Sequence, residues 1–123
     1  MTIHIGTSDT GPSAGVITPK LVFTTATAID ESTMRRAVEA QTVHDEVRIC
    51  LERIEETLRQ ADLSLRDLAK VTCWVSHEDY RFPFAYAYRE LLAPGPYASR
   101  GLFRTGLLAD CRVQIDAIAA RTP

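Results

Sequence analysis

Two charged residues in the last quarter of the chain, Arg100 and Asp116, are of types that together could bind and activate a small molecule. A guanidinium presents two parallel donors that match a carboxylate and fix its orientation. A neighbouring carboxylate can hold a water molecule and accept a proton from it. The pair therefore indicates a site for a small carboxylate-bearing ligand, if the fold brings the two side chains together.

The element expected to bring them together is a C-terminal β-hairpin. Residues 100–105 and 111–120 read as strands, and the short segment 106–110 joins them. If this loop closes symmetrically, the register puts Arg100 directly opposite Asp116. The alternative is an exposed ion pair on a solvated sheet face, which contributes little to stability.

The same register makes two further predictions. Arg104 and Arg112 become cross-strand neighbours, which is unfavourable unless an anion lies between them or the register is off by one. Phe103 falls on the core face. Apolar and other residues alternate over residues 70–76, so that Trp74 points away from the core. A fully solvent-exposed tryptophan is unusual. Another copy of the chain is the simplest cover for that face.

The remaining segments predict the elements that carry this hairpin. Residues 14–18 and 20–26 read as strands, residues 34–60 carry the apolar stripe of an amphipathic helix, and residues 70–76 form a strand. A second helix follows a Ser76/Asp79 capping box and ends before Pro94. The order β-β-α-β-α-β-β predicts an α+β fold with two helices on one face of a mixed sheet.

Composition limits the classes of function. The 123 residues, 46% hydrophobic, suit one domain over residues 1–123, and a net charge of -2 with only two lysines argues against nucleic acid as a partner. No segment is apolar enough to span a bilayer, so we expect no membrane partner. Cys50, Cys73 and Cys111 are expected to be reduced core thiols of a cytoplasmic protein. No residue spacing around His44 completes a metal site.

The C-terminal residues also carry a resemblance to a known family. Arg100-Gly-Leu-Phe, a short loop, and Val-Gln-Ile-Asp-Ala-Ile-Ala at residues 113–119 resemble the signature of the YjgF/RidA family. Similar residues fall in the family's order over nearly the whole chain, namely Gly11-Pro12, Gln41, Leu51, Ile54, Leu68 to Thr72, and Tyr88. The resemblance implies a chorismate-mutase-like, RidA-like fold and a homotrimer with small-molecule clefts at its subunit interfaces.

The family's chemistry is the hydrolysis of reactive enamines or imines to 2-oxo acids and ammonia, without a metal or an organic cofactor. Arg100 matches the substrate-carboxylate arginine if one residue is deleted in the following loop, and Asp116 matches the acidic position near the C-terminus. The resemblance therefore implies Arg100 and Asp116 as catalytic residues. Expected substrate contacts are Arg100, Leu102, Ser13, Tyr88 and Trp74.

Several positions depart from the family's pattern. Ser13 stands where tyrosine is common, Thr25-Ala26 replaces Ser-Gly, Ala85 replaces asparagine, Leu102 replaces cysteine, and Asp116 is shorter than the usual glutamate. Two functions are compatible with these changes. One is a deaminase acting on a different small carboxylate-bearing imine. The other is a RidA-like trimer that binds a metabolite without turnover, as an accessory protein of a pathway.

Overall fold

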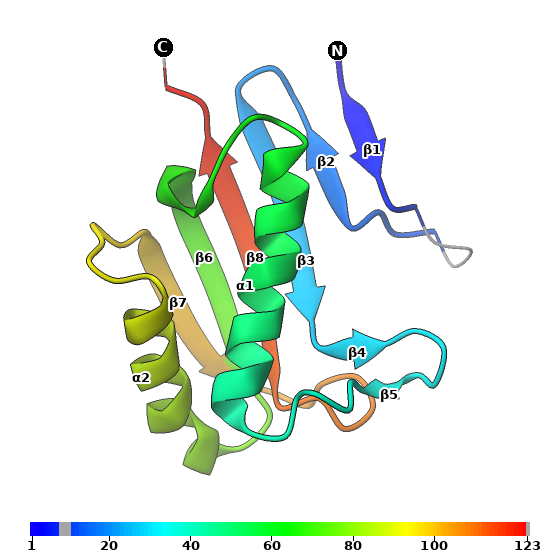
Figure 1. The fold of residues 1–123 in the computed structure, drawn as a ribbon, viewed down its shortest axis with the longest axis vertical. Helices are drawn as coiled ribbons and strands as arrows, with labels where there is room; N and C mark the ends of the chain where they lie inside the picture. The colour runs from blue at the N-terminus through cyan, green and yellow to red at the C-terminus, as the bar shows by residue number, and fades with distance from the viewer. Residues whose placement is uncertain (8–10, 123) are drawn as a thin grey trace.

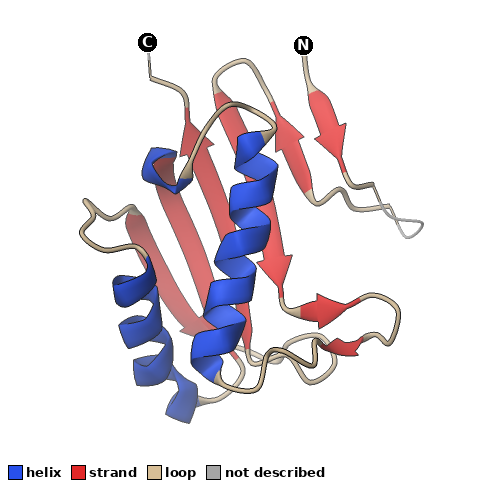
Figure 2. Cartoon of the chain, viewed as in Figure 1, coloured by secondary structure: helices blue, strands red, loops and turns tan. Residues whose placement is uncertain are grey.

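In the described residues, 1–7 and 11–122, the computed structural model has a six-stranded sheet with two α-helices packed on one face (Figure 1, Figure 2). The strand order is β1-β2-β3-β8-β6-β7, and β4 pairs with β5 in a separate ribbon. The predicted α+β class is confirmed. The bounds are β1 Ile3–Ile5, β2 Gly15–Ile17, β3 Leu21–Thr27, β4 Ile29–Asp30, β5 Arg35–Arg36, α1 Val43–Arg59, β6 Leu68–Val75, α2 Arg81–Leu91, β7 Ser99–Arg104 and β8 Val113–Ala120.

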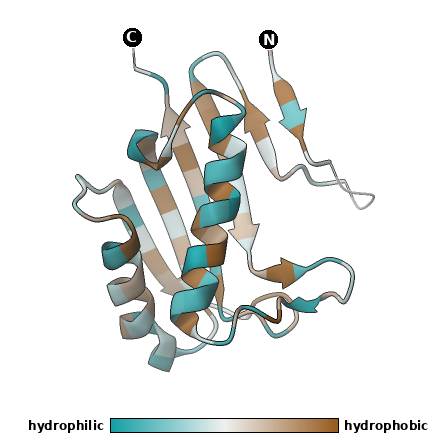
Figure 3. Cartoon of the chain, viewed as in Figure 1, coloured by the Kyte–Doolittle hydropathy of each residue, from teal (hydrophilic) through white to brown (hydrophobic). Residues whose placement is uncertain are grey.

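The core lies between α1, α2 and the sheet. Every second residue of β3, of β8 and of β6 from Val71 onward is buried, because successive side chains of a strand point to opposite faces. The expected stripe of α1 packs on these residues, and the outward side of that helix is largely hydrophilic (Figure 3). The core side chains with no exposed surface include Val47, Cys50, Ile54, Leu58, Val71, Cys73, Val75, Phe84, Val113, Ile115 and Ala119.

The first helix begins later than its apolar pattern predicted. The Thr42 side chain accepts a hydrogen bond from the Asp45 backbone N–H at 3.0 Å, and the Asp45 carboxylate accepts from the Thr42 N–H at 3.1 Å. This capping box satisfies donors that the first turn leaves open, so α1 starts at Val43. Residues 34–42 instead form β5 and turns.

The start of the second helix also differs from the prediction. The proposed Ser76/Asp79 capping box is wrong, because the Asp79 N–H donates to His77 Nδ1 at 3.1 Å. His77 caps a 3-10 turn over Glu78–Tyr80, which leads into α2. Of the helices in the described residues, none is long and apolar enough to cross a membrane.

The predicted C-terminal hairpin is wrong. β7 pairs with β6 in parallel, whereas β8 lies between β3 and β6 and is antiparallel to both. The segment from β6 through α2 to β7 is a βαβ unit, and such a crossover returns the chain parallel to the strand it left. The chain then passes to the other side of β6, where the alternating residues of β8 fill the centre of the sheet.

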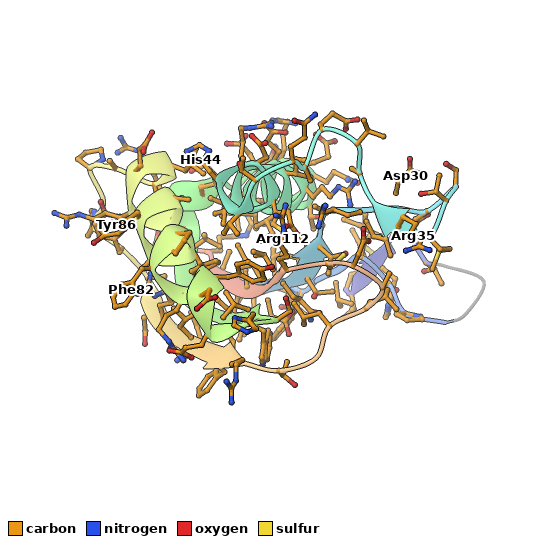
Figure 4. All side chains as sticks on the ribbon, turned by 90° about the horizontal axis from the view of Figure 1, so that it is seen from below. Asp30, Arg35, His44, Phe82, Tyr86 and Arg112 are labelled. Carbon is orange, nitrogen blue, oxygen red and sulfur yellow. The ribbon has the colours of Figure 1, made fainter. Side chains whose placement is uncertain are left out.

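A buried ion pair fixes the beginning of β8. The Glu46 carboxylate of α1, which has no exposed surface, accepts hydrogen bonds from Arg112 Nε and from the Arg112 backbone N–H, the latter at 2.9 Å. Arg112 lies between α1 and the sheet (Figure 4). The predicted Arg104–Arg112 neighbours are therefore apart: Arg104 pairs in register with Val75 of β6, and Arg112 has its own carboxylate.

Candidate functional site

Asp116 lies in the middle of the open face of the sheet, the face opposite the helices. Its register partners are Thr25 on β3 and Thr72 on β6. Asp116 Oδ1 accepts a hydrogen bond from Thr25 Oγ1 at 2.5 Å and another from Gln114 Nε2 at 3.2 Å. Within the described residues Oδ2 accepts none, so one oxygen is fixed by the protein and the other can accept from a water or a ligand.

A cavity of about 390 Å³ opens beside this carboxylate, within the size range of small-molecule sites. It is lined by hydroxyl groups and apolar side chains, and Lys70 is the basic residue among its described lining residues. Its lining includes Ser13, Phe23, Thr25, Lys70, Thr72, Asp116 and Ile118. The cavity thus holds one cationic and one anionic side chain.

Ser13, two residues before β2 begins, also lines this cavity. Its Oγ is 3.2 Å from Thr7 Oγ1 and 3.5 Å from His4 Nδ1. Of the predicted site residues, Ser13 and Asp116 therefore share one cavity.

Arg100 lies on the other side of the sheet. Its register partner on β6 is Val71, a core residue, whereas Asp116 is paired with Thr72. Partners in register point to the same face, so Arg100 points toward α2 and Asp116 points away from the helices. The expectation that the two side chains lie beside each other is wrong. The predicted hairpin put positions 100 and 116 on the same face of the sheet. The observed pairing puts them on opposite faces, because a shift of one residue in register exchanges the two faces of a strand.

Tyr88 and Leu102 lie with Arg100. Cζ of Arg100 is 5.0 Å from the centre of the Tyr88 ring, a cation–π arrangement. Leu102 is paired with Cys73 and packs against the core. Burial raises the pKa of Tyr88 to about 12. In the described part of the chain its hydroxyl has no hydrogen-bond partner.

Trp74 lies on the open face as predicted, between Gln114 of β8 and Phe103 of β7. Phe103 does not belong to the core face: 54% of it is exposed beside Trp74. Phe23 is 39% exposed on β3, where it pairs in register with Ile118, two residues along β8 from Asp116. On the open face, the polar side chains of Thr25, Asp116 and Thr72 therefore have apolar side chains on either side along the strands.

Four contributors to the Asp116 cavity and its hydrogen bonds were missed as site residues: Thr25, Lys70, Thr72 and Gln114. Each occupies an outward position in a strand whose alternation is visible in the sequence. The missing information was the strand order, which places β3 and β6 on either side of β8.

The cysteines and the acidic residues bear on two other kinds of site, a reactive thiol and a metal site. Cys50, Cys73 and Cys111 are free and buried, and burial raises the pKa of Cys73 to about 12, which suppresses its thiolate. The described residues contain no group of three or more His, Cys, Asp or Glu side chains placed to hold a metal.

Comparison with solved structures places this arrangement among known folds. The YjgF gene product of E. coli matches with a TM-score of 0.82 and 18% identity, over 97% of this chain and 94% of that one. NMB1025 of Neisseria meningitidis, a member of the YjgF protein family, matches with a TM-score of 0.82 and 15% identity, over 100% of this chain and 97% of that one. The chain has the YjgF/Rid fold.

A further Rid-fold structure is E. coli TdcF with bound serine, with a TM-score of 0.79 and 25% identity over 91% of this chain and 90% of that one. Other similar structures are described as candidate endoribonucleases. No family model and no curated protein sequence matches the chain. The resemblance seen in the sequence is thus confirmed at the level of the fold, and the identities mark a divergent sequence.

Proposed function

We propose that this Rid-fold protein hydrolyses a small carboxylate-bearing enamine or imine to a 2-oxo acid, or a ketone, and ammonia without a cofactor. The observation that carries the proposal is one open-face cavity containing both Asp116 and Lys70. A 2-imino acid has the complementary pair of charges: its carboxylate is attracted to the Lys70 ammonium and its protonated imine nitrogen to Asp116. The serine bound by TdcF likewise carries a nitrogen and a carboxylate.

Asp116 is suited to position the attacking water. Thr25 and Gln114 both donate to Oδ1, which holds the carboxylate still and leaves Oδ2 to accept a hydrogen bond from water. As the water oxygen bonds to the imine carbon, Asp116 accepts a water proton. That proton then passes to the nitrogen, and the C–N bond breaks with its electron pair leaving on nitrogen as ammonia. The carbinol hydroxyl gives its proton back to the Asp116 carboxylate as it becomes the carbonyl, and the departing ammonia takes up that proton. Fixing both reactants makes the attack effectively intramolecular.

Lys70 replaces Arg100 as the proposed carboxylate-binding residue. An ammonium is a compact, strongly hydrated charge without the fork geometry of a guanidinium, so it attracts a carboxylate but orients it less. We propose that other copies of the chain cover the open face in a homotrimer, because Trp74, Phe103 and Phe23 leave apolar area on it. Such a cover would remove water and strengthen the attraction of Lys70 for an anion.

The second candidate is metabolite binding without turnover. It is favoured by the position of Arg100, which the resemblance had assigned to the substrate carboxylate and which points to the helix side. With Lys70 alone as the cation, the cavity can retain a small acid without aligning it for attack. Both candidates use the same cavity, and they differ only in whether Asp116 acts on a water.

The test is hydrolysis of 2-iminobutyrate generated in situ, followed by semicarbazide trapping. Wild type should suppress semicarbazone formation. Asp116→Asn should lower the rate by about 100-fold, the contribution of a general base, and Lys70→Met should weaken substrate binding. Arg100→Met is the matched control and should behave as wild type. Saturable binding of 2-oxobutyrate with no rate enhancement would instead establish the binding function. Loss of activity in Arg100→Met but not in Lys70→Met would restore the assignment of Arg100.

A further inference from the structure

The open-face cavity has an apolar side next to its charged one. Val16 of β2, Phe23 of β3 and Ile118 of β8 pair in register, and Lys70 of β6 pairs with Ile118 at the end of this row. Partners in register point to the same face of the sheet, and all four residues line the cavity. Among the described lining residues the charged side chains are Lys70 and Asp116, so the part of the lining on β2 and β3 carries no charge.

Phe23 has the largest side chain of this apolar row and is 39% exposed. Its row neighbours Val16 and Ile118 are partly buried. Thr25, the polar side chain that β3 contributes to the same cavity, donates its hydroxyl to Asp116 Oδ1. A molecule bound over β3 therefore meets the Phe23 ring, and covering that ring removes apolar area from water.

Three cavity residues surround Ile118 in different directions. Lys70 and Phe23 pair with it from the neighbouring strands β6 and β3, and Asp116 precedes it by two residues on β8, on the same face. From the spacing of strands and of residues along a strand, these three positions form a triangle with sides of about 8–10 Å. The side chains reach inward from its corners, so a small molecule can contact all three.

The trigonal carbon of a 2-imino acid has three substituents that spread in one plane: the carboxylate, the imine nitrogen and the side chain. With the carboxylate toward Lys70 and the nitrogen toward Asp116, the remaining direction leads across Ile118 to Phe23. The side chain of the substrate then lies on the uncharged part of the lining.

We propose that the open-face cavity selects 2-imino acids with a branched or aromatic apolar side chain, and that Phe23 is the residue that determines this specificity. The inference rests on the proposed deaminase function, because it uses the same orientation of the substrate. Each methylene group removed from water strengthens binding about fourfold. The imine derived from leucine has two carbon atoms more than 2-iminobutyrate, so the cavity should favour it by about tenfold.

Kinetics with two imines test the specificity. The imines are released in situ from 2-aminobutyrate and from leucine by an amino-acid oxidase, and their hydrolysis is followed by semicarbazide trapping. The ratio of the two kcat/KM values should favour the leucine-derived imine by about tenfold in wild type and fall to about one in Phe23→Ala. Phe23→Leu, which keeps an apolar side chain, should retain a preference for the larger imine.

Phe103→Ala is the matched control. Phe103 is also an exposed phenylalanine on the open face, but it lies on β7 outside the cavity lining. Its removal takes a similar apolar area from the face, and the ratio of the two kcat/KM values should stay at the wild-type value. The ratio is the informative quantity because a loss of folding or assembly lowers both rates alike.

Binding of the product acids separates this inference from the deaminase function. In calorimetric titrations, 4-methyl-2-oxopentanoate should bind wild type about tenfold more tightly than 2-oxobutyrate, and Phe23→Ala should bind both equally. If this preference is found but neither imine is hydrolysed, the deaminase function fails and the specificity of the cavity stands. If both imines are hydrolysed with equal kcat/KM, or the preference survives in Phe23→Ala, the inference is overturned and the deaminase function stands. Failure of the protein to bind either acid or to hydrolyse either imine would overturn both.

Discussion

The buried Glu46–Arg112 pair offers the sharpest test of how the fold holds the open-face site. Glu46 has no exposed surface and accepts two hydrogen bonds from Arg112, which also donates from Nη2 to the Ala40 carbonyl at 3.1 Å. The pair joins α1 to the residue that precedes β8, the strand that carries Gln114 and Asp116. Glu46→Gln keeps the shape of the side chain and one acceptor oxygen but removes the charge.

The expected loss of stability follows from burial. The Arg112 side chain is 17% exposed, so Glu46→Gln leaves a largely desolvated guanidinium without a counter-charge. Removing one partner of a buried ion pair costs about 3–5 kcal/mol, and the retained amide oxygen puts this variant near 3 kcal/mol. With about 2.1 cal/mol/K of unfolding entropy per residue, a chain of 123 residues should lose about 12 °C in melting temperature. This is a large share of a total stability of about 6–18 kcal/mol.

Urea unfolding followed by Trp74 fluorescence measures the loss, with Glu52→Gln as the matched control. Glu52 is also on α1 and also pairs with an arginine, Arg48, at 3.2 Å, but 59% of its side chain is exposed. Exposed pairs of this kind contribute at most about 1 kcal/mol. Equal losses in Glu46→Gln and Glu52→Gln would refute the argument that burial makes the Glu46–Arg112 pair important.

Three further predictions follow from particular contacts. Thr25→Val removes a donor to Asp116 and should lower the rate of imine hydrolysis by about tenfold, while the free energy of unfolding in urea stays within about 1 kcal/mol of wild type. An unchanged rate would contradict the role of Thr25. Because burial raises the pKa of Cys73 to about 12 and that of Cys111 above its ordinary value, iodoacetamide at pH 8 should label neither thiol by mass spectrometry until urea is added, and rapid native labelling would contradict their burial. The backbone N–H of Thr42 lowers the Asp45 pKa below its ordinary 3.8, so the stabilisation by this carboxylate is complete above pH 3.8 and is lost as the pH falls through the lower folded-state value. The urea midpoints of wild type and Asp45→Asn should therefore converge on acidification, and a constant difference down to about pH 2 would exclude this linkage.

Much of the architecture could be predicted from the sequence, because burial on one side of an element leaves a periodic pattern. The alternation in residues 20–26, 70–76 and 111–120 located β3, β6 and β8, and the stripe ending near Gln60 located α1. The outward position of Trp74 followed from the same alternation. The C-terminal residues resemble the signature of the YjgF/RidA family and so predicted its fold, which the solved structures confirm.

The tertiary structure alone decided which of these residues meet. Alternation shows that a strand has two faces but does not identify its neighbours, so the sequence could not show that β6 separates β7 from β8. That separation puts Arg100 beside Tyr88. Asp116 instead accepts hydrogen bonds from Thr25 and Gln114 and lines the open-face cavity together with Lys70. The two charged side chains were correctly placed on strands. Their partners were set by the parallel crossover from β6 to β7 and by the strand register, which decides the face on which each side chain lies. Both depend on long-range pairing that local sequence does not encode.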